Sequence, residues 1–245
     1  MTSTHPLAGA TAAPVADPMA DLRRRVEQAG HDLDGAPALE IVRWAVEALD
    51  GSLTVAGSMQ DAVLPHLVSR VLPGVDVLFL ETGYHFAETV QTRDVVARSL
   101  PVTVVDALPR QSVAEQDAEF GPRLHERDPN LCCFLRKVDP LARALEPYAG
   151  WVTGVRRDEA PTRAGTPVLG WDDKHDMVKV NPLATWTMAD VEAYQVEHDL
   201  PRNPLVAQGF PSIGCAPCTR RVAPGEDPRA GRWSGKDKTE CGIHT

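Results

Sequence analysis

Short apolar segments alternate with helical patterns through the first half of the chain, and this alternation constrains the fold more than any other feature. Apolar runs of strand length occur at residues 53–56, 75–80 and 102–105. Between them, residues 62–71 and 85–98 have the length and composition of helices. Strands joined by helices at this spacing predict a parallel sheet with right-handed crossovers. We therefore expect an α/β fold, a twisted parallel sheet flanked by helices.

The rest of the chain extends this pattern and ends in irregular structure. Residues 107–131 are polar and predict irregular structure, and residues 1–20, rich in Ala, Thr, Ser and Pro, predict a disordered arm. We expect one domain over residues 21–226 and a mobile tail over 227–245. Further helices are expected at residues 21–29, 36–49, 133–145 and 187–198, and further strands at 151–154 and 177–180.

Composition limits the partners and the compartment. The 245 residues carry a formal net charge of −9, so we expect no nucleic-acid partner. No apolar run is long enough to span a bilayer, and residues 1–20 lack the basic start and apolar stretch of a secretory signal. The odd number of cysteines, five, favours free thiols and metal ligands over structural disulfides. We therefore expect a cytoplasmic protein with no membrane partner.

Two polar loops, at residues 57–61 and 81–83, follow the first two expected strands. They lie at the edge of the sheet where ligands bind in this fold class. The first leads into a helix, and free N–H groups at such a turn can bind an anion, although a simple turn explains it equally. Residues 220–238 carry six basic and three acidic side chains, which form either a cationic pocket or a solvated tail.

Four cysteines form two close pairs, Cys132 with Cys133 and Cys215 with Cys218. Four thiolates suit either zinc or a four-iron four-sulfur cluster. Neighbouring residues are awkward ligands for one tetrahedral ion, whereas a cluster offers separate iron atoms, so we favour the cluster. A redox Cys-x-x-Cys lacks its usual strand and helix context here, and inert buried thiols do not explain two pairs.

The fifth cysteine, Cys241, lies close to the C-terminus with Lys238 and His244 beside it. Nearby cations favour a thiolate, so Cys241 is a candidate nucleophile. The alternative is an exposed thiol without a function, and the local sequence does not decide between the two.

Taken together, these motifs resemble the assimilatory adenosine 5′-phosphosulfate (APS) reductases of bacteria and plants. The resemblance covers about residues 50–245 and implies the adenine-nucleotide α-hydrolase fold. It implies reduction of APS to sulfite and AMP by thioredoxin or a thioredoxin-like donor, in sulfate assimilation and cysteine biosynthesis. The motifs that carry it are Cys132-Cys133 with Arg136-Lys137, Gly214-Cys215-x-x-Cys218-Thr219, and Glu240-Cys241-Gly242-Ile243-His244.

The resemblance also implies roles for individual residues. Cys241 is the expected nucleophile, His244 is expected to position it, and Lys137 to link the cluster and the substrate electrostatically. One four-iron four-sulfur cluster is expected on Cys132, Cys133, Cys215 and Cys218. The implied substrate-binding residues are Ser58, Gln60, Asp61, Leu80, Thr82, Gly83, Arg156, Arg157, Arg229 and Arg232, with Trp233 packed beside the last of them.

The chain departs from the family pattern at three places. Gln60 stands where many relatives have Glu, Glu81 where many have Asp, and Asp158-Glu159 where Gln-Ser is usual. None of these differences falls at one of the five cysteines. The alternative functions are the related 3′-phospho-APS (PAPS) reductases, which lack the cluster cysteines, a zinc-stabilised nucleotide-binding module, and an adenylating enzyme of the same broad fold. Relatives self-associate, which implies a homo-oligomer, although no interface is marked in the sequence.

Overall fold

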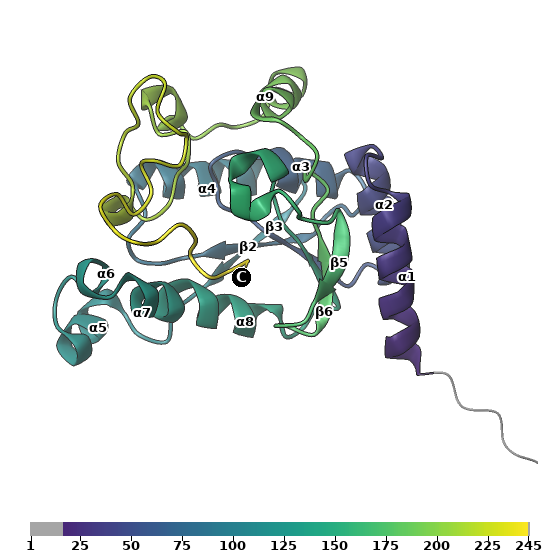
Figure 1. Ribbon diagram of the computed structural model, residues 1–245, viewed down its shortest axis with the longest axis horizontal. Helices are drawn as coiled ribbons and strands as arrows, with labels where there is room; N and C mark the ends of the chain where they lie inside the picture. The colour runs from purple at the N-terminus through teal and green to yellow at the C-terminus, as the bar shows by residue number, and fades with distance from the viewer. Residues whose placement is uncertain (1–16, 245) are drawn as a thin grey trace, which may run out of the picture.

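The computed structural model describes residues 17–244. Six strands form one sheet in the order β3-β2-β1-β4-β6-β5 (Figure 1). Every neighbouring pair is parallel except β5 and β6, so the predicted parallel α/β sheet is confirmed and β5 is an unpredicted antiparallel edge. The strands are β1 Leu53–Ala56, β2 Asp76–Leu80, β3 Thr103–Ala107, β4 Gly150–Val152, β5 Leu169–Asp172 and β6 Met177–Val180.

Helices connect the strands and surround the sheet. They are α1 Pro18–Asp32, α2 Ala38–Ala48, α3 Val63–Ser69, α4 Ala87–Ser99, α5 Val113–Phe120, α6 Leu124–Arg127, α7 Pro129–Cys133, α8 Asp139–Leu145 and α9 Met188–Glu197. A π-helical segment, Phe134–Val138, joins α7 to α8, and short 3-10 turns occur at Arg157–Glu159, Pro161–Arg163, Val206–Gln208 and Ala216–Cys218.

The prediction of irregular structure at residues 107–131 is wrong, because local capping builds helices there. The Ser112 side chain caps the start of α5, and the Glu115 carboxylate reaches back to the Ser112 N–H (2.7 Å). Asp128 caps α7, and Pro129 occupies its first turn. Polar composition hid these helices, because their apolar positions are few.

Strand side chains alternate between two apolar clusters, one on each face of the sheet. Val77 and Phe79 of β2 join the larger cluster, which packs against α1, α2, α3, α4 and α9. Leu78, between them, joins the smaller cluster with Trp151 of β4 and with Leu141 of α8. The sheet is therefore a middle layer, and Figure 1 shows α8 on one side and α3 and α4 on the other.

The order of the strands marks where a ligand would bind. From β1 the chain moves outward to β2 and β3, whereas from β4 it moves the other way, to β5 and β6. Neighbouring strands whose connections leave in opposite directions form a switch point, and a crevice opens beyond their carboxyl ends. The loop after β1 and the segment after β4 meet at this crevice.

The first described helix begins earlier than expected, and the C-terminal tail packs against the body of the protein. The predicted N-terminal arm lies outside the described residues up to residue 16, but residues 18–20 form the first turn of α1, capped by Asp17. The C-terminal tail runs back across the molecule and ends near its middle (Figure 1), where Ile243 packs against the smaller apolar cluster. Its mobility and the division into domains stay predictions.

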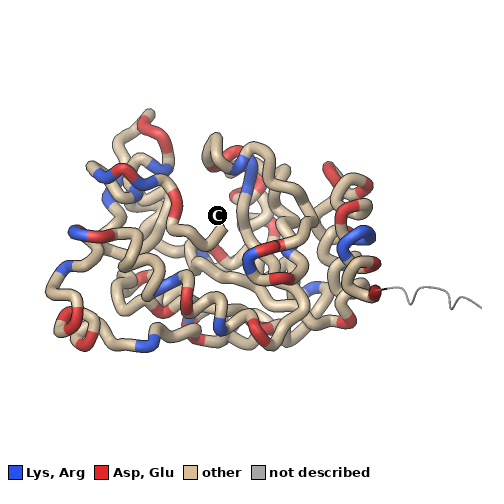
Figure 2. Tube along the Cα trace, turned by 60° about the horizontal axis from the view of Figure 1, so that its bottom comes forward, with Lys and Arg blue, Asp and Glu red and all other residues tan. Residues whose placement is uncertain are grey.

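Charge is spread over the trace rather than gathered on one part of it. Figure 2 shows acidic and basic residues interspersed along the chain. In the described part of the chain, no helix is both long enough and apolar enough to cross a membrane.

Candidate active site

A cavity lies beyond the carboxyl ends of β1, β2 and β4, at the switch point of the sheet. Its walls come from the loop after β1, the end of β2, the segment after β4 and the C-terminal tail. The structure therefore brings together residues from opposite ends of the described chain. The predicted site residues that line it are Ser58, Gln60, Asp61, Leu80, Lys137, Arg156, Arg229, Arg232, Cys241 and His244.

The loop after β1 turns tightly against β2. A Cβ at Gly57 would lie 2.8 Å from a methyl carbon of Val77, so the close approach favours glycine. Ser58 follows and is exposed at the cavity. Asp61 accepts a hydrogen bond from the Val63 N–H (3.0 Å) at the start of α3, and burial raises the pKa of its carboxyl. The anion site expected here therefore shares the helix start with an acidic group.

Gln60 and Arg232 hold the same stretch of backbone from two sides. The Gln60 amide accepts from the Ile213 N–H (2.9 Å) and donates to the Pro211 carbonyl (3.2 Å). The Arg232 guanidinium donates to the Ser212 hydroxyl and the Ile213 carbonyl, both at 3.2 Å. Burial lowers the pKa of Arg232, and its Nε is buried without a hydrogen-bond partner. Gln60 thus positions the backbone at residues 211–213 to which Arg232 donates.

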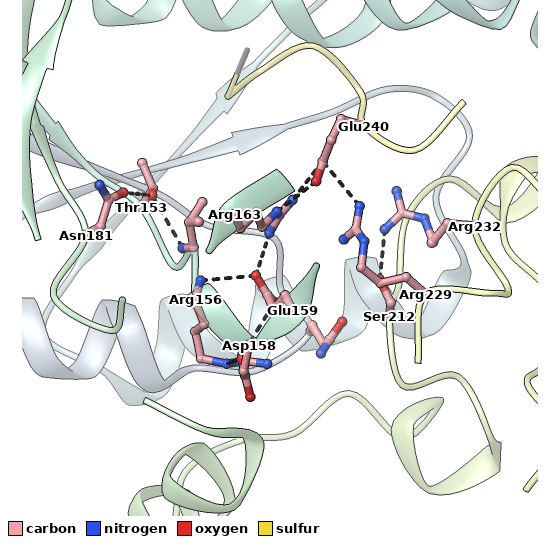
Figure 3. A network of polar contacts seen from close by, with 12 residues as sticks. Thr153, Arg156, Asp158, Glu159, Arg163, Asn181, Ser212, Arg229, Arg232 and Glu240 are labelled. Carbon is pink, nitrogen blue, oxygen red and sulfur yellow. Dashed lines mark hydrogen bonds and ion pairs between the residues drawn. The ribbon is translucent and has the colours of Figure 1, made fainter. Parts of the chain in front are cut away.

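The two arginines after β4 point in different directions. Arg156 is buried at the cavity and pairs with Asp158 (3.1 Å) and Glu159 (3.5 Å). These are the two acidic residues by which the chain departs from the family pattern, and Figure 3 shows them around Arg156. Arg157 instead pairs with Asp34 (2.9 Å) and does not line the cavity. Substrate contact by Arg157 stays a prediction.

The C-terminal tail places Cys241 in the cavity wall. The carboxylate of the preceding Glu240 lies between Arg163 (2.8 Å) and Arg229 (3.2 Å), as Figure 3 shows. Arg229 also donates to the Thr239 carbonyl (2.9 Å). The thiol interacts electrostatically with Lys137 and Arg232, and Arg229 lines the same cavity.

His244 lies at the end of the described tail and packs against the sheet. Its ring stacks on Trp151, with centroids 5.7 Å apart and an interplanar angle of 13°. Burial, and then the positive charge of Lys179 and Arg163, lowers the pKa of His244 well below its ordinary value. The docked imidazole is therefore neutral at neutral pH.

A second, smaller cavity lies next to the first, and Lys137, Arg232 and Trp233 line both. Burial works against a charged Lys137, but its interactions with Cys215 and Cys241 outweigh burial and raise the pKa of the ammonium. Lys137 is thus a cation shared by the two cavities. All four paired cysteines line the smaller cavity, namely Cys132, Cys133, Cys215 and Cys218.

Local structure explains how the two cysteine pairs meet. The Asp128 carboxylate accepts from the N–H groups of Asn130 (3.1 Å) and Leu131 (2.9 Å), which starts α7 just before Cys132. On the other side, the Thr219 hydroxyl donates to the Cys215 carbonyl (2.9 Å) and fixes the cysteine loop. The π-helical segment after Cys133 then turns Lys137 toward both cavities, in keeping with the frequent use of such segments at functional sites.

The environment of the four paired cysteines suits a metal centre that several thiolates bind together. Burial first, and then the neighbouring thiols, raise the pKa of Cys132 to about 12 and that of Cys218 to about 11. Four thiolates would repel one another here without a bound cation. Among residues 17–244, however, no group of three or more His, Cys, Asp or Glu side chains is arranged to hold a single metal ion. Four cysteines that line one cavity are a donor set that both zinc and a four-iron four-sulfur cluster accept.

The loop after β2 contributes less to the first cavity than expected. Leu80 lines it, but Thr82 and Gly83 do not. Thr82 is buried beside the cysteine loop, with its Oγ1 accepting from the Cys215 thiol (3.4 Å), and its carbonyl accepts from Arg136. Gly83 has a φ of 72° and packs against Arg136. Both residues contact Arg136, which lines the smaller cavity, and their contact with a substrate stays a prediction.

Arg163 and His85 line the cavity but were missed from the sequence. Arg163 lies in a stretch that reads as a plain loop, and its partner Glu240 is 77 residues away, so no local signal identifies it. His85 stacks on Phe79, with centroids 4.6 Å apart, and its Nε2 contacts the Leu80 carbonyl at 2.8 Å. Its place directly after the expected binding loop was the only available signal.

Comparison with known proteins agrees with this site. Residues 51–221 match the phosphoadenosine phosphosulfate reductase domain. The chain is 58% identical to the adenosine 5′-phosphosulfate reductase of Streptomyces coelicolor and 53% identical to that of Mycolicibacterium smegmatis. Each match covers 91% of this chain and 95% of the relative.

Solved structures point the same way. A phosphoadenylyl-sulfate (PAPS) reductase from Candida auris, in a phosphate complex, superposes with a TM-score of 0.69 at 27% identity, over 81% of this chain and 97% of that one. Yeast FAD synthetase, with a TM-score of 0.53 and 13% identity over 83% and 75% of the two chains, shares the fold. The chain belongs to the phosphoadenosine phosphosulfate reductase family, as its cysteine motifs indicated, and its similar relatives include bacterial adenosine 5′-phosphosulfate reductases.

Proposed function

We propose that this chain reduces APS to sulfite and AMP, with electrons from thioredoxin or a thioredoxin-like donor, in sulfate assimilation and cysteine biosynthesis. The similarity to relatives named adenosine 5′-phosphosulfate reductase supports the substrate. The observation that carries the proposal is the position of Cys241 in the wall of a cavity that Arg229 also lines, in electrostatic contact with Lys137 and Arg232. Cationic side chains attract the phosphosulfate group of APS, which carries two negative charges. They thereby favour attack by the thiol on its sulfur atom.

In the first step, the Cys241 thiolate attacks the sulfur atom of the sulfate group. A sulfur–sulfur bond forms, the sulfur–oxygen bond to AMP breaks, and its electron pair leaves on the phosphate oxygen. Arg229 and Arg232 stabilise the charge that develops on the leaving group. Lys137, held in its charged form by neighbouring thiolates, favours the attacking thiolate. The enzyme is left with S-sulfocysteine at position 241.

In the second step, a thioredoxin thiolate attacks the Cys241 sulfur and displaces sulfite. The second thioredoxin thiol then closes the thioredoxin disulfide and restores the Cys241 thiol. The first step needs Cys241 inside the cavity, whereas the second needs it exposed to a protein partner. A tail over residues 227–245 that docks and then leaves meets both needs.

The four cysteines of the smaller cavity would hold one four-iron four-sulfur cluster. They come from the end of α7 and from the loop around the Ala216–Cys218 turn, and they face one cavity. The neighbouring Cys132 and Cys133 are awkward ligands for one tetrahedral zinc ion, whereas a cluster offers each of them a separate iron atom. When bound, the cluster ties α7 to the cysteine loop and sets the electrostatic environment of Lys137. No electron of the proposed reaction passes through it.

The proposed setting is the cytoplasm. All five cysteines lie within the described residues as free thiols, which suits a reducing compartment. Self-association of the chain stays a prediction.

The experiment that tests this function supplies the purified holoprotein with APS and reduced thioredoxin. We expect sulfite and AMP in equal amounts, and about four iron and four sulfide per chain. A parallel assay with PAPS should give much slower turnover. Preferential use of PAPS would replace the proposal with a PAPS reductase, and colourless protein with stoichiometric zinc and no sulfite would replace it with a zinc-stabilised nucleotide-binding module.

A further inference from the structure

Glu240 stands directly before the proposed nucleophile, and its carboxylate is held by two arginines (Figure 3). Arg163 binds it as a fork, with Nε 2.8 Å from one carboxylate oxygen and Nη2 2.8 Å from the other. The Arg229 Nη2 lies 3.2 Å from the second oxygen. A two-point guanidinium–carboxylate contact fixes orientation as well as distance.

This contact is shielded from solvent. The side chains of Glu240, Arg163 and Arg229 are only 11%, 13% and 15% exposed. Salt and water therefore weaken it less than they weaken a surface ion pair. Burial works against the charged form, but the hydrogen bonds and charge of Arg163, together with the charges of Arg229 and Arg232, lower the pKa of Glu240, so the group is a carboxylate at neutral pH.

The same contact joins the tail to the body of the protein. Arg163 ends the Pro161–Arg163 turn in the segment after β4, and Glu159 holds its guanidinium from the other side (2.5 Å). After Cys241, the Lys174 ammonium donates to the Gly242 carbonyl (2.7 Å), and His244 stacks on the sheet. Cys241 is therefore fixed from both sides, with charged pairs before it and a hydrogen bond and stacking after it.

We propose that Glu240 is a positioning residue, a latch whose pairs with Arg163 and Arg229 hold the tail docked and Cys241 in the cavity. The proposal rests on the proposed function only in taking Cys241 as the reacting thiol. Breaking the two pairs frees the tail, which is the change that exposes Cys241 to a protein partner. The docked fraction, and with it the access to Cys241, is then set by Glu240.

The test measures how fast a bulky maleimide attached to polyethylene glycol labels Cys241 in the holoprotein, with peptide mapping to assign the label. Such a reagent is too large for the cavity, so its rate reports the undocked fraction. We expect Glu240→Gln to raise the labelling rate about tenfold or more, because a charge-assisted pair is lost. Glu240→Asp, which keeps the charge, should restore part of the slow labelling.

Glu226→Gln is the matched control. It removes the same charge from an ion pair with Arg220 (3.1 Å) that is far more exposed. We expect wild-type labelling and wild-type sulfite release from it. Arg163→Met should raise the labelling rate less than Glu240→Gln does, because the pair with Arg229 remains. The double variant should label no faster than Glu240→Gln, which already lacks the contact with Arg163. Salt at about 0.5 M should speed labelling of the wild type more than of Glu240→Gln.

Labelling of Glu240→Gln at the wild-type rate would overturn the latch, and so would fully additive effects of Glu240→Gln and Arg163→Met. If Glu240→Gln failed to fold, Arg163→Lys would serve instead. It keeps the charge but not the fork, so it should label faster than the wild type, and an unchanged rate would overturn the proposal. No APS is needed, so the latch can hold even if the chain releases no sulfite, and can fail while the reductase activity stands.

Discussion

Gly214→Ala should lower the catalytic efficiency of the enzyme strongly while leaving its fold intact. Gly214 precedes Cys215 and packs directly on the Arg232 guanidinium. A Cβ at position 214 would lie 2.4 Å from Nη2, 2.6 Å from Cζ and 3.0 Å from Nε of Arg232. Ordinary contact begins at 3.4 Å, so the guanidinium must move by about 1 Å. Because it is the end of a flexible side chain, it can move without displacing backbone.

The structure sets the size of the expected effects. Overpacking costs about 1–3 kcal/mol of folding stability, and a movable side chain puts this change at the low end of that range. The same movement pulls Arg232 off the Ser212 hydroxyl and the Ile213 carbonyl, which now fix it at 3.2 Å each. A misplacement of about 1 Å in a positioning group can cost about 100-fold in rate. We therefore expect kcat/KM for APS to fall about 100-fold, which is about 2.7 kcal/mol.

The assay combines sulfite release, thermal unfolding, and iron and sulfide content. Gly165→Ala is the control, because a Cβ at position 165 meets no atom within 4 Å. Arg232→Lys should lose activity to a similar extent without any clash, since lysine cannot reproduce the two fixed hydrogen bonds. Wild-type kcat/KM in Gly214→Ala with its cluster intact would refute the reasoning about Arg232.

Three further predictions follow from the site. Cys241→Ser should lower sulfite release at least about 10³-fold while iron and sulfide stay at the wild-type level, because the nucleophile and the cluster ligands are separate. As the pH falls below about 6.5, the free His244 gains a proton that its docked form resists, so docking should weaken and labelling of Cys241 should rise relative to a His244→Asn variant. Cys218→Ser should lose iron and unfold at a lower temperature, since Cys218 and Cys132 line one cavity.

Each of these has an outcome that contradicts it. Turnover by Cys241→Ser near the wild-type rate would show that Cys241 is not the nucleophile. A ratio of wild-type to His244→Asn labelling that stays flat between about pH 7.5 and 5.5 would show that His244 docks without regard to its charge. Full iron content in Cys218→Ser would mean that this thiol is not a ligand.

The sheet and its ligand edge could be predicted because both follow from local patterns. Apolar runs such as residues 53–56 and 177–180 match β1 and β6 to the residue. The loop at residues 57–61 lies at the switch point because parallel strands place all their carboxyl ends on one side. The strand β5 escaped prediction, since Leu169–Asp172 is short, half-buried and contains a glycine.

The site was harder to predict where its contacts are long-range. The sequence predicted that Cys132 and Cys218 belong to one metal site, because free thiols have few other roles in a reducing compartment. Arg163 could not be predicted as a site residue, because an arginine in a loop is usually solvated and its partner Glu240 is distant in sequence. Arg157 follows a strand as a binding residue would, but its guanidinium pairs with Asp34, and no local signal indicates that partner.

The most direct test of the account is a single turnover under anaerobic conditions, with sulfur-labelled APS and no thioredoxin. Intact-protein mass and peptide mapping then locate the label. The account predicts one sulfonate on Cys241, released as sulfite when reduced thioredoxin is added. Protein with its full iron and sulfide that carries no label on Cys241, or carries it on another residue, would contradict the proposed mechanism.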